Sequence, residues 1–261
     1  MSAYFNGDEV EVTFTGDKSA QPAVVGAISG ESSTVNTICG PTDDRERSAA
    51  ARAARYLGSG GCSGWMIRDV NHCFLTAGHC GNNAQGGGTM QFNVPSSTPS
   101  GGMVNPGPED QYAVDPDSVQ FDNSGVGADW MYLGTFANSN TGLTAWEAQQ
   151  DAYALTTDVP AVGDYTQKYG YGTTNPRNED SQAQQFHGLE GSYFGTQGDY
   201  GARYTIDTTG GDSGSGVEST PGIAFAVHTH GGCTSAGTGS NAGTLLVNAD
   251  LQDALVRTTL H

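Results

Sequence analysis

The stretch Gly-Gly-Asp-Ser-Gly-Ser-Gly at residues 210–216 places Ser213 between glycines. Glycine on both sides lets the backbone turn sharply around the serine and leaves its hydroxyl exposed. The same turn points the main-chain N–H groups of Gly211 and Ser213 at the position where negative charge develops when a hydroxyl attacks a carbonyl carbon. A Gly/Ser-rich loop without chemistry has the same composition, so the stretch needs support from elsewhere in the chain.

Two further stretches supply that support. Residues 76–80 (Thr-Ala-Gly-His-Cys) place His79 just after an apolar run, where an imidazole is held firmly and titrates near neutral pH, as a general base must. Asp129 opens the apolar run at residues 130–133 and fits the buried acid that fixes the tautomer of such a histidine. Asp115 and Asp122 compete for this role, but neither leads into an apolar run.

The order along the chain is His79, Asp129, Ser213. This is the order of the chymotrypsin-type catalytic triad, and it differs from the orders in subtilisins and α/β-hydrolases. An α/β-hydrolase esterase is therefore disfavoured, because its nucleophile would precede its acid and base. The other alternative is a protease-like binding module, which typically lacks a triad member, whereas all three are present here.

The composition predicts an all-β fold. The 261 residues include 39 glycines, and apolar residues make up 36%. Short apolar runs at residues 61–67, 73–77 and 129–133 are typical of strands. Residues 84–107 and 138–150 are typical of connections. Residues 251–256 are typical of a short helix that Asn248 or Asp250 would cap.

We expect two six-stranded antiparallel β-barrels with a short C-terminal helix. Residues 35–145 would form the first barrel with His79 and Asp129, and residues 146–261 the second with Ser213. Residues 1–34 form a leader, a pro-segment remnant or an edge strand.

The charge limits the partners. The net charge is −18 with only 10 Lys and Arg, so neither nucleic acid nor an anionic membrane is an expected partner. No stretch approaches the roughly 20 apolar residues of a membrane span, and residues 1–30 show no signal-peptide pattern. We expect a monomer that acts on polypeptides.

The chain resembles the trypsin/chymotrypsin superfamily, and within it the bacterial glutamyl-endopeptidase-like branch, from about residue 35 to residue 260. The residues that carry the resemblance lie at 43–45, 62–67, 76–80, 129–130, 207–215 and 226–229. The resemblance implies a double barrel with the site in the cleft between barrels, peptide hydrolysis through an acyl-enzyme, no cofactor, no metal, and secretion.

Two positions depart from the branch. Asp212 stands where the glutamyl enzymes often have Asn or Gln, and Gly216 replaces a usual proline. In trypsin-like enzymes the equivalent acid pairs with an amine released by processing. Whether Asp212 meets such an amine or an arginine stays open at this stage.

The resemblance also indicates the substrate site. Thr208 and His228 match the residues that bind a substrate carboxylate in glutamyl endopeptidases, and protonated His228 would form a charge-assisted pair with it. Asp207 instead matches the acid of trypsin, which predicts cleavage after Arg or Lys as the alternative. Thr229, His230 and Gly231 resemble the strand that pairs with the substrate backbone, and the Thr229 hydroxyl would reach Asp129.

Five cysteines are present, so at least one lies outside any intramolecular pair. Cys62 and Cys80 match the family disulfide that ties a strand to the histidine loop. Cys39 and Cys233 are the next candidates for a pair, which would leave Cys73 as a buried thiol. A metal site at the His-Cys pairs of residues 72–73 and 79–80 is disfavoured, because adjacent strand residues point to opposite faces.

Overall fold

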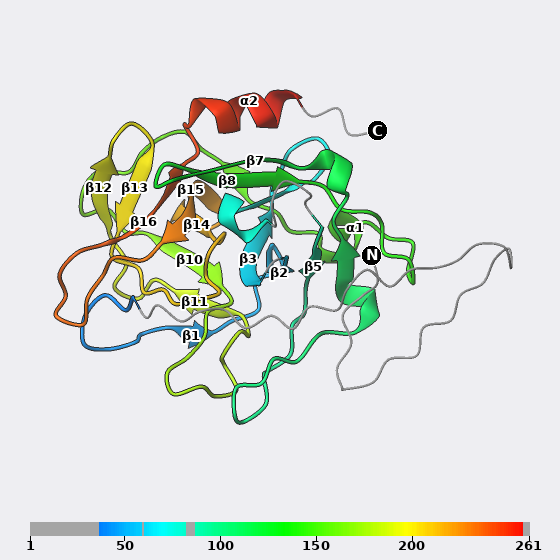
Figure 1. Cartoon of the computed structure of the whole chain (residues 1–261), viewed down its shortest axis with the longest axis horizontal. Coiled ribbons are helices and arrows are strands. Elements are labelled where there is room, and N and C mark those ends of the chain that lie inside the picture. Colours follow the sequence, from blue (N-terminus) through cyan, green and yellow to red (C-terminus); the bar gives the residue numbers. More distant parts are fainter. Residues whose placement is uncertain (1–36, 59, 82–86, 258–261) are drawn as a thin grey trace, which may run out of the picture.

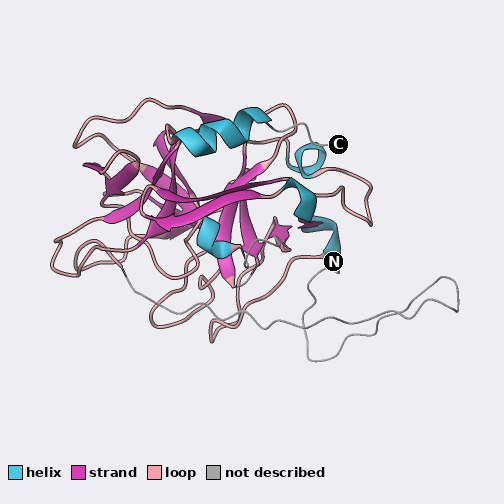
Figure 2. Cartoon of the chain, turned by 45° about the horizontal axis from the view of Figure 1, so that its top comes forward, coloured by secondary structure: helices cyan, strands magenta, loops and turns pink. Residues whose placement is uncertain are grey.

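The computed structural model describes residues 37–58, 60–81 and 87–257 (Figure 1). The expected leader at residues 1–34 lies outside the described residues. The described chain is built of two antiparallel sheets with few helices, which confirms the predicted all-β, two-barrel fold. In Figure 2 strands fill the interior, and α2 (Ala249–Arg257) lies along the outside.

The first sheet has seven strands among the described residues, in the order β6-β5-β2-β3-β4-β8-β7. Its strands are β2 (Ala53–Leu57), β3 (Gly61–Met66), β4 (Phe74–Thr76), β5 (Thr89–Gln91), β6 (Gln111–Ala113), β7 (Gln120–Gly125) and β8 (Ala128–Leu133). The alternation of buried apolar side chains on one face forms a core that includes Met66, Met90, Phe92 and Leu133.

The second sheet has nine strands in the described chain, in the order β1-β11-β10-β14-β15-β16-β13-β12, with β9 parallel to β15. Its strands are β1 (Glu46–Arg47), β9 (Ala154–Leu155), β10 (Gln167–Gly170), β11 (Gln185–His187), β12 (Tyr193–Gln197), β13 (Gly201–Tyr204), β14 (Gly216–Thr220), β15 (Ile223–His230) and β16 (Asn241–Leu245). Both sheets thus exceed the six strands expected. In the second sheet, the two-residue strands β1 and β9 account for part of the excess: β1 lies at the edge beside β11, and β9 pairs with β15.

Another cluster of buried residues joins the two sheets. Trp65 and Tyr132 of the first sheet pack with Val227 of the second and with Leu251 of α2. Burial of each such side chain stabilises the fold by about 1.5–3 kcal/mol. Asn248 caps α2, since its Oδ1 accepts a hydrogen bond from the N–H of Leu251 at 2.9 Å. A five-residue helix, α1 (Ala145–Gln149), lies within the expected connection.

The segment at residues 37–47, here called the N-terminal strap, joins the second sheet and not the first. β1 pairs with β11, Thr37 forms a bridge with Thr208, and a disulfide links Cys39 to Cys233. The strap precedes the first barrel in sequence, yet it packs on the barrel that carries Ser213.

Candidate active site

The histidine and aspartate predicted from the sequence lie together. His79 sits in a 3-10 turn (Gly78–Cys80) after β4, and Asp129 is the second residue of β8, which pairs with β4. Nδ1 of His79 lies 2.6 Å from Oδ2 of Asp129, and the His79 N–H donates to Oδ1 at 3.0 Å. Asp129 is fully buried. The carboxylate favours the tautomer with a proton on Nδ1, so Nε2 is the basic nitrogen.

Ser213 belongs to a loop that is fixed against the first barrel. Its carbonyl accepts a hydrogen bond from the N–H of Ser63 at 2.8 Å, and the Sγ of Cys80 lies 3.7 Å from the same oxygen. Cys80 follows His79 in the chain. The structure therefore brings Ser213 to the junction of the two barrels, next to the turn that carries the imidazole.

The loop before Ser213 leaves main-chain donors free. Gly211 has φ +104°, a conformation that favours glycine, and its carbonyl accepts from the Ser63 hydroxyl at 2.9 Å. Within the described residues, the N–H groups of Gly211 and Ser213 donate to no carbonyl. Two free N–H groups beside a serine hydroxyl are the arrangement that would stabilise an oxyanion if the hydroxyl attacked a carbonyl.

Asp212 points away from this side of the loop, into the second barrel. It is fully buried, and its Oδ2 accepts from the Thr209 N–H at 2.8 Å. The sequence left open whether Asp212 meets an amine released by processing or an arginine. Among the described residues, an arginine is one of its charged neighbours. Asp212 lies 3.7 Å from Arg45 of the strap, 3.3 Å from Nζ of Lys168 and 3.4 Å from Nε2 of His187. The sequence analysis missed Lys168 and His187, because both lie on strands far from Asp212 in the chain.

Thr208 and His228, which the resemblance assigns to the substrate site, contact each other. Oγ1 of Thr208 lies 2.7 Å from Nε2 of His228, and the Tyr204 hydroxyl lies 2.7 Å from its Nδ1. Burial lowers the pKa of His228 well below its usual value, so this imidazole is neutral at pH 7. Tyr204 is a third member that the sequence analysis missed, since nothing in its local sequence marks it.

Asp207 does not join that group. Its carboxylate accepts main-chain hydrogen bonds from Cys39 at 2.7 Å and from Asp44 at 3.1 Å, both in the strap. It borders a cavity of about 290 Å³ that Asp44 and Glu190 also line. The side chain of Asp207 thus faces the strap, whereas the side chain of Thr208 faces His228.

The three residues expected to pair with a substrate backbone lie at the end of β15. Thr229 Oγ1 has Ala242 O at 3.5 Å and His230 Nδ1 at 2.7 Å as its partners, in place of the expected contact with the Asp129 carboxylate. His230 Nδ1 lies 3.9 Å from Oδ2 of Asp129, and its ring centre lies 6.1 Å from that of His79. One face of Gly231 is covered by Thr37. Their pairing with a substrate stays a prediction.

Both expected disulfides are present. Cys62 is bonded to Cys80 and Cys39 to Cys233, and Cys73 is a buried free thiol. The only group of potential metal ligands found within the described part of the chain is Cys62, His79 and Cys80. The two sulfurs are bonded to each other there, so they are not available as thiolates.

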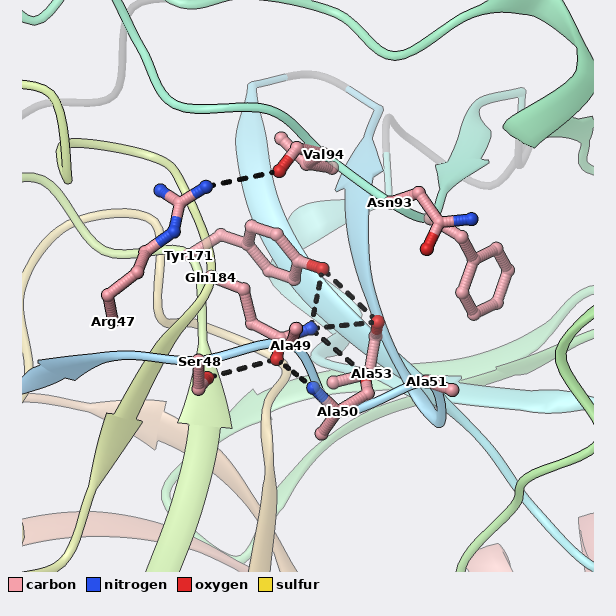
Figure 3. A pocket seen from close by; sticks show the side chains of 11 residues that line it. Arg47, Ser48, Ala49, Ala50, Ala51, Ala53, Asn93, Val94, Tyr171 and Gln184 are labelled. Atoms are coloured by element: carbon pink, nitrogen blue, oxygen red, sulfur yellow. Dashed lines mark hydrogen bonds between the residues drawn. The ribbon is translucent and has the colours of Figure 1, made fainter.

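A cavity of about 530 Å³ lies between the start of β2 and the end of β5 (Figure 3). Figure 3 shows the Tyr171 hydroxyl and the Gln184 amide bonded to each other and to the carbonyl of Ala53, at 3.0–3.4 Å. None of the residues predicted to act in catalysis or substrate binding lines it. It is therefore separate from the site described above.

No helix in the described residues is long and apolar enough to cross a membrane. No protein-family model matches the chain, and no curated protein sequence matches it.

Solved structures do match. A Glu endopeptidase in complex with MPD superimposes with a TM-score of 0.58 at 20% identity, covering 84% of this chain and 98% of that one. The protease Anisep from Arthrobacter nicotinovorans gives 0.59 at 16% identity, over 81% and 99% of the two chains. Human heparin binding protein gives 0.57 at 15% identity, over 82% and 94%. The chain therefore has the two-barrel fold of the chymotrypsin-like serine proteases.

Proposed function

We propose that the protein is a serine endopeptidase with His79, Asp129 and Ser213 as its catalytic triad. The observation that carries the proposal is the double contact of His79 with the buried Asp129 carboxylate. The turn that contains His79 also contacts Ser213, through Cys80. A carboxylate, an imidazole and a serine in this order constitute a base-activated nucleophile.

The mechanism follows from these positions. Nε2 of His79 takes the proton of the Ser213 hydroxyl as its oxygen attacks the peptide carbonyl. The N–H groups of Gly211 and Ser213 bind the resulting oxyanion. His79 then donates its proton to the leaving amine, and water hydrolyses the acyl-enzyme by the same steps in reverse. Asp129 holds the imidazole and stabilises its protonated form. No step needs a cofactor.

The second candidate function is that of a binding module on the same fold, since one structural neighbour is a heparin binding protein. Heparin is a polyanion, and a net charge of −18 opposes its binding. A binding module does not require a histidine held by a buried carboxylate, as His79 is held by Asp129. Both observations favour the enzyme.

For specificity, we propose cleavage after Glu or Asp. In the row Tyr204, His228, Thr208, the imidazole of His228 lies between the two hydroxyls and forms a buried hydrogen bond with each. A substrate carboxylate that enters would favour protonation of His228 and gain a charge-assisted bond. The alternative, cleavage after Arg or Lys, requires the Asp207 carboxylate, which is engaged by two main-chain N–H groups of the strap.

Two disulfides favour an oxidising compartment, so we propose that the protein acts outside the cytosol, on polypeptides and as a monomer.

Two experiments test the proposal. A fluorophosphonate probe should label the wild-type protein on Ser213 and leave Ser213→Ala unlabelled; labelling of both, or of neither, contradicts the triad.

A peptide library should then show cleavage after Glu or Asp. Thr208→Val should lower kcat/KM for Glu substrates by about tenfold, the value of one hydrogen bond to a charged group. Asp207→Asn is the matched control, and it should leave the preference unchanged; cleavage only after Arg or Lys, lost in this variant, would reverse the assignment.

A further inference from the structure

Asp212 is a buried carboxylate directly before the proposed nucleophile Ser213 in the chain. The residues around it leave room for the carboxylate and place cations beside it. Positions 170 and 172 are glycines, and a Cβ at either one would collide with the Asp212 carboxylate. Lys168, His187 and Asp212 are completely buried, and the Arg45 side chain is 2% exposed. Such a cluster is costly unless its charges compensate one another.

The charges in this cluster do compensate. Arg45 forms a bidentate pair with Asp43, at 2.8 and 2.7 Å, and its third nitrogen donates to the Thr209 hydroxyl at 2.7 Å. Burial lowers the pKa of His187 to about 3, so this imidazole is neutral near pH 7. With Arg45 shared between two carboxylates, Lys168 is the remaining full charge opposite Asp212. Among the described residues, no other carboxylate forms an ion pair with Lys168.

The carboxylate is tied to the loop that carries the oxyanion donors. Oδ2 accepts the Thr209 N–H, and the Asp212 N–H donates back to the Thr209 carbonyl at 3.1 Å. Gly211 and Ser213 flank Asp212, so the direction of their N–H groups depends on where its side chain is held. Oδ1, which makes no hydrogen bond to another described residue, faces Lys168 and His187.

We propose that Lys168, supported by Arg45, is the built-in counter-charge that keeps Asp212 inside and the oxyanion donors in place. The loop then needs no amine released by cleavage of the chain. Lys168 is a positioning residue: it acts on the reaction through Asp212. The catalytic part of this inference rests on the proposed endopeptidase function, whereas the conformational part does not.

The position of the strap agrees with this. Arg45 reaches the loop from a segment that is anchored on both sides of it. Before it, Cys39 is bonded to Cys233 and donates its N–H to Asp207; after it, β1 pairs with β11. Any cut before residue 37 leaves these contacts in place, so both cations stay beside Asp212 whatever the N-terminus of the chain.

A pH dependence follows from the same geometry. The charged or titratable groups that act on Lys168 or Asp212 are Arg45, His187, Asp207 and His228. Burial lowers the pKa of Lys168 to about 8, and Asp212 opposes this decrease. Lys168 lies on β10, which is paired with β11 and β14, so we expect it to stay buried if Asp212 alone swings out. It would then lose the partner that opposes the effect of burial, and its pKa would fall further. The closed loop therefore binds the proton more tightly, and its advantage is present below about pH 8 and is lost as the pH rises through that value.

The decisive experiment is hydrogen exchange of residues 207–216 in full-length Ser213→Ala, which cannot cleave itself. Adding Lys168→Met should speed exchange there at least about tenfold without affecting β16, because a buried carboxylate has lost its partner. The control Arg177→Met removes an exposed charge and should change neither segment. Unchanged exchange in the Lys168→Met protein would overturn the proposal, whether or not the protein is a protease.

A second arm tests the N-terminus. The same Ser213→Ala chain, with its Met1 amine free or acetylated, should show equally slow exchange at residues 207–216. The proposal is contradicted if slow exchange appears only after cleavage has freed a new amine and is lost when that amine is acetylated.

If Lys168→Met proves too unstable to study, the double variant Lys168→Met/Asp212→Asn removes both charges. It should recover thermal stability relative to Lys168→Met; a further loss of stability would refute the pairing.

In the active enzyme, Lys168→Met should lower kcat by about 100-fold or more with KM changed less than about threefold, because fewer molecules hold the loop closed. The fraction of wild-type protein titrated by a fluorophosphonate should fall as the pH rises through about 8, and this fall should be absent in Lys168→Met. An equal alkaline decrease in both proteins would assign it to another group.

Discussion

His79 and Asp129 are joined twice, once through the imidazole Nδ1 at 2.6 Å and once through the main-chain N–H at 3.0 Å. The two contacts use the two oxygens of one carboxylate. The carboxylate of Asp129 thereby holds both the imidazole ring and the main chain of the turn that carries it. Because Asp129 is fully buried, water does not compete for either contact.

Replacing Asp129 by Asn should therefore remove most activity while the fold persists. An amide can accept the main-chain hydrogen bond, but its nitrogen would favour the wrong imidazole tautomer. We expect kcat to fall by about 10⁴-fold near neutral pH, as in other triads of this type. Steady-state kinetics on a cleaved peptide give the value. Asp122→Asn on the neighbouring strand β7 is the matched control, and a comparable loss in that variant would show that the effect is not specific to Asp129.

Ser63 connects the oxyanion loop to the first barrel through its hydroxyl as well as through its main-chain N–H. The hydroxyl accepts the Tyr171 N–H and donates to the Gly211 carbonyl, both at 2.9 Å. Ser63→Ala leaves a buried N–H without a partner, which costs about 1–3 kcal/mol of the free energy of unfolding. We expect kcat to fall about tenfold with little change in KM. Ser124→Ala, on the surface, provides the comparison, and a Ser63→Ala enzyme with wild-type kcat would remove Ser63 from this role.

The sequence predicted the strands next to His79 and Asp129, because each of these two residues adjoins an apolar run. The strands β3, β4 and β8 lie within one or two residues of the expected runs. It did not predict β5, which lies in the expected loop at residues 84–107. Three residues there become a strand only through pairing with β2 and β6, which are distant in the chain. The helix α1 was missed although its signal was visible: Thr144 and Glu147 form a capping box.

The candidate site could be proposed from the sequence where a residue stands in a motif with a known use, as for His79, Asp129 and Ser213, whose roles stay predictions. It was not predictable where a role depends on a partner far along the chain. Nothing near Lys168 in the sequence indicates that it faces Asp212. Likewise the side chains of Asp207 and Thr208 point to different neighbours: Asp207 accepts hydrogen bonds from the strap, whereas Thr208 contacts His228.

The disulfide between Cys39 and Cys233 should stabilise the protein, because it links residues 194 positions apart. The double variant Cys39→Ser/Cys233→Ser should lose about 2–5 kcal/mol, since the unfolded chain gains freedom when a long loop is opened. Thermal unfolding should show a Tm lower by roughly 5–15 °C. The control Cys73→Ala removes a cysteine that forms no disulfide. A Tm equal to that of the wild type in the double variant would mean that the strap is held by its hydrogen bonds alone.

Asp207 should make the protein less stable as the pH rises from about 4 to 7. Burial raises the pKa of its carboxyl to about 6, with the nearby Asp44 adding to the effect, whereas the N–H groups of Cys39 and Asp44 oppose it. The folded protein therefore holds a proton that the unfolded chain releases at lower pH. The stability that this proton provides is complete below about pH 4 and is lost as the pH rises through about 6.

Urea unfolding at pH 4.5 and pH 7 should show this decrease in the wild type and not in Asp207→Asn, whose side chain does not titrate. The two proteins should differ in the size of their pH-dependent change by an amount on the order of 2 kcal/mol. Asp158→Asn, which removes an exposed carboxyl, should follow the wild type. Parallel curves for wild type and Asp207→Asn would mean that the strap does not hold a protonated carboxyl at position 207, and the pH dependence would then have to arise elsewhere in the acidic surface.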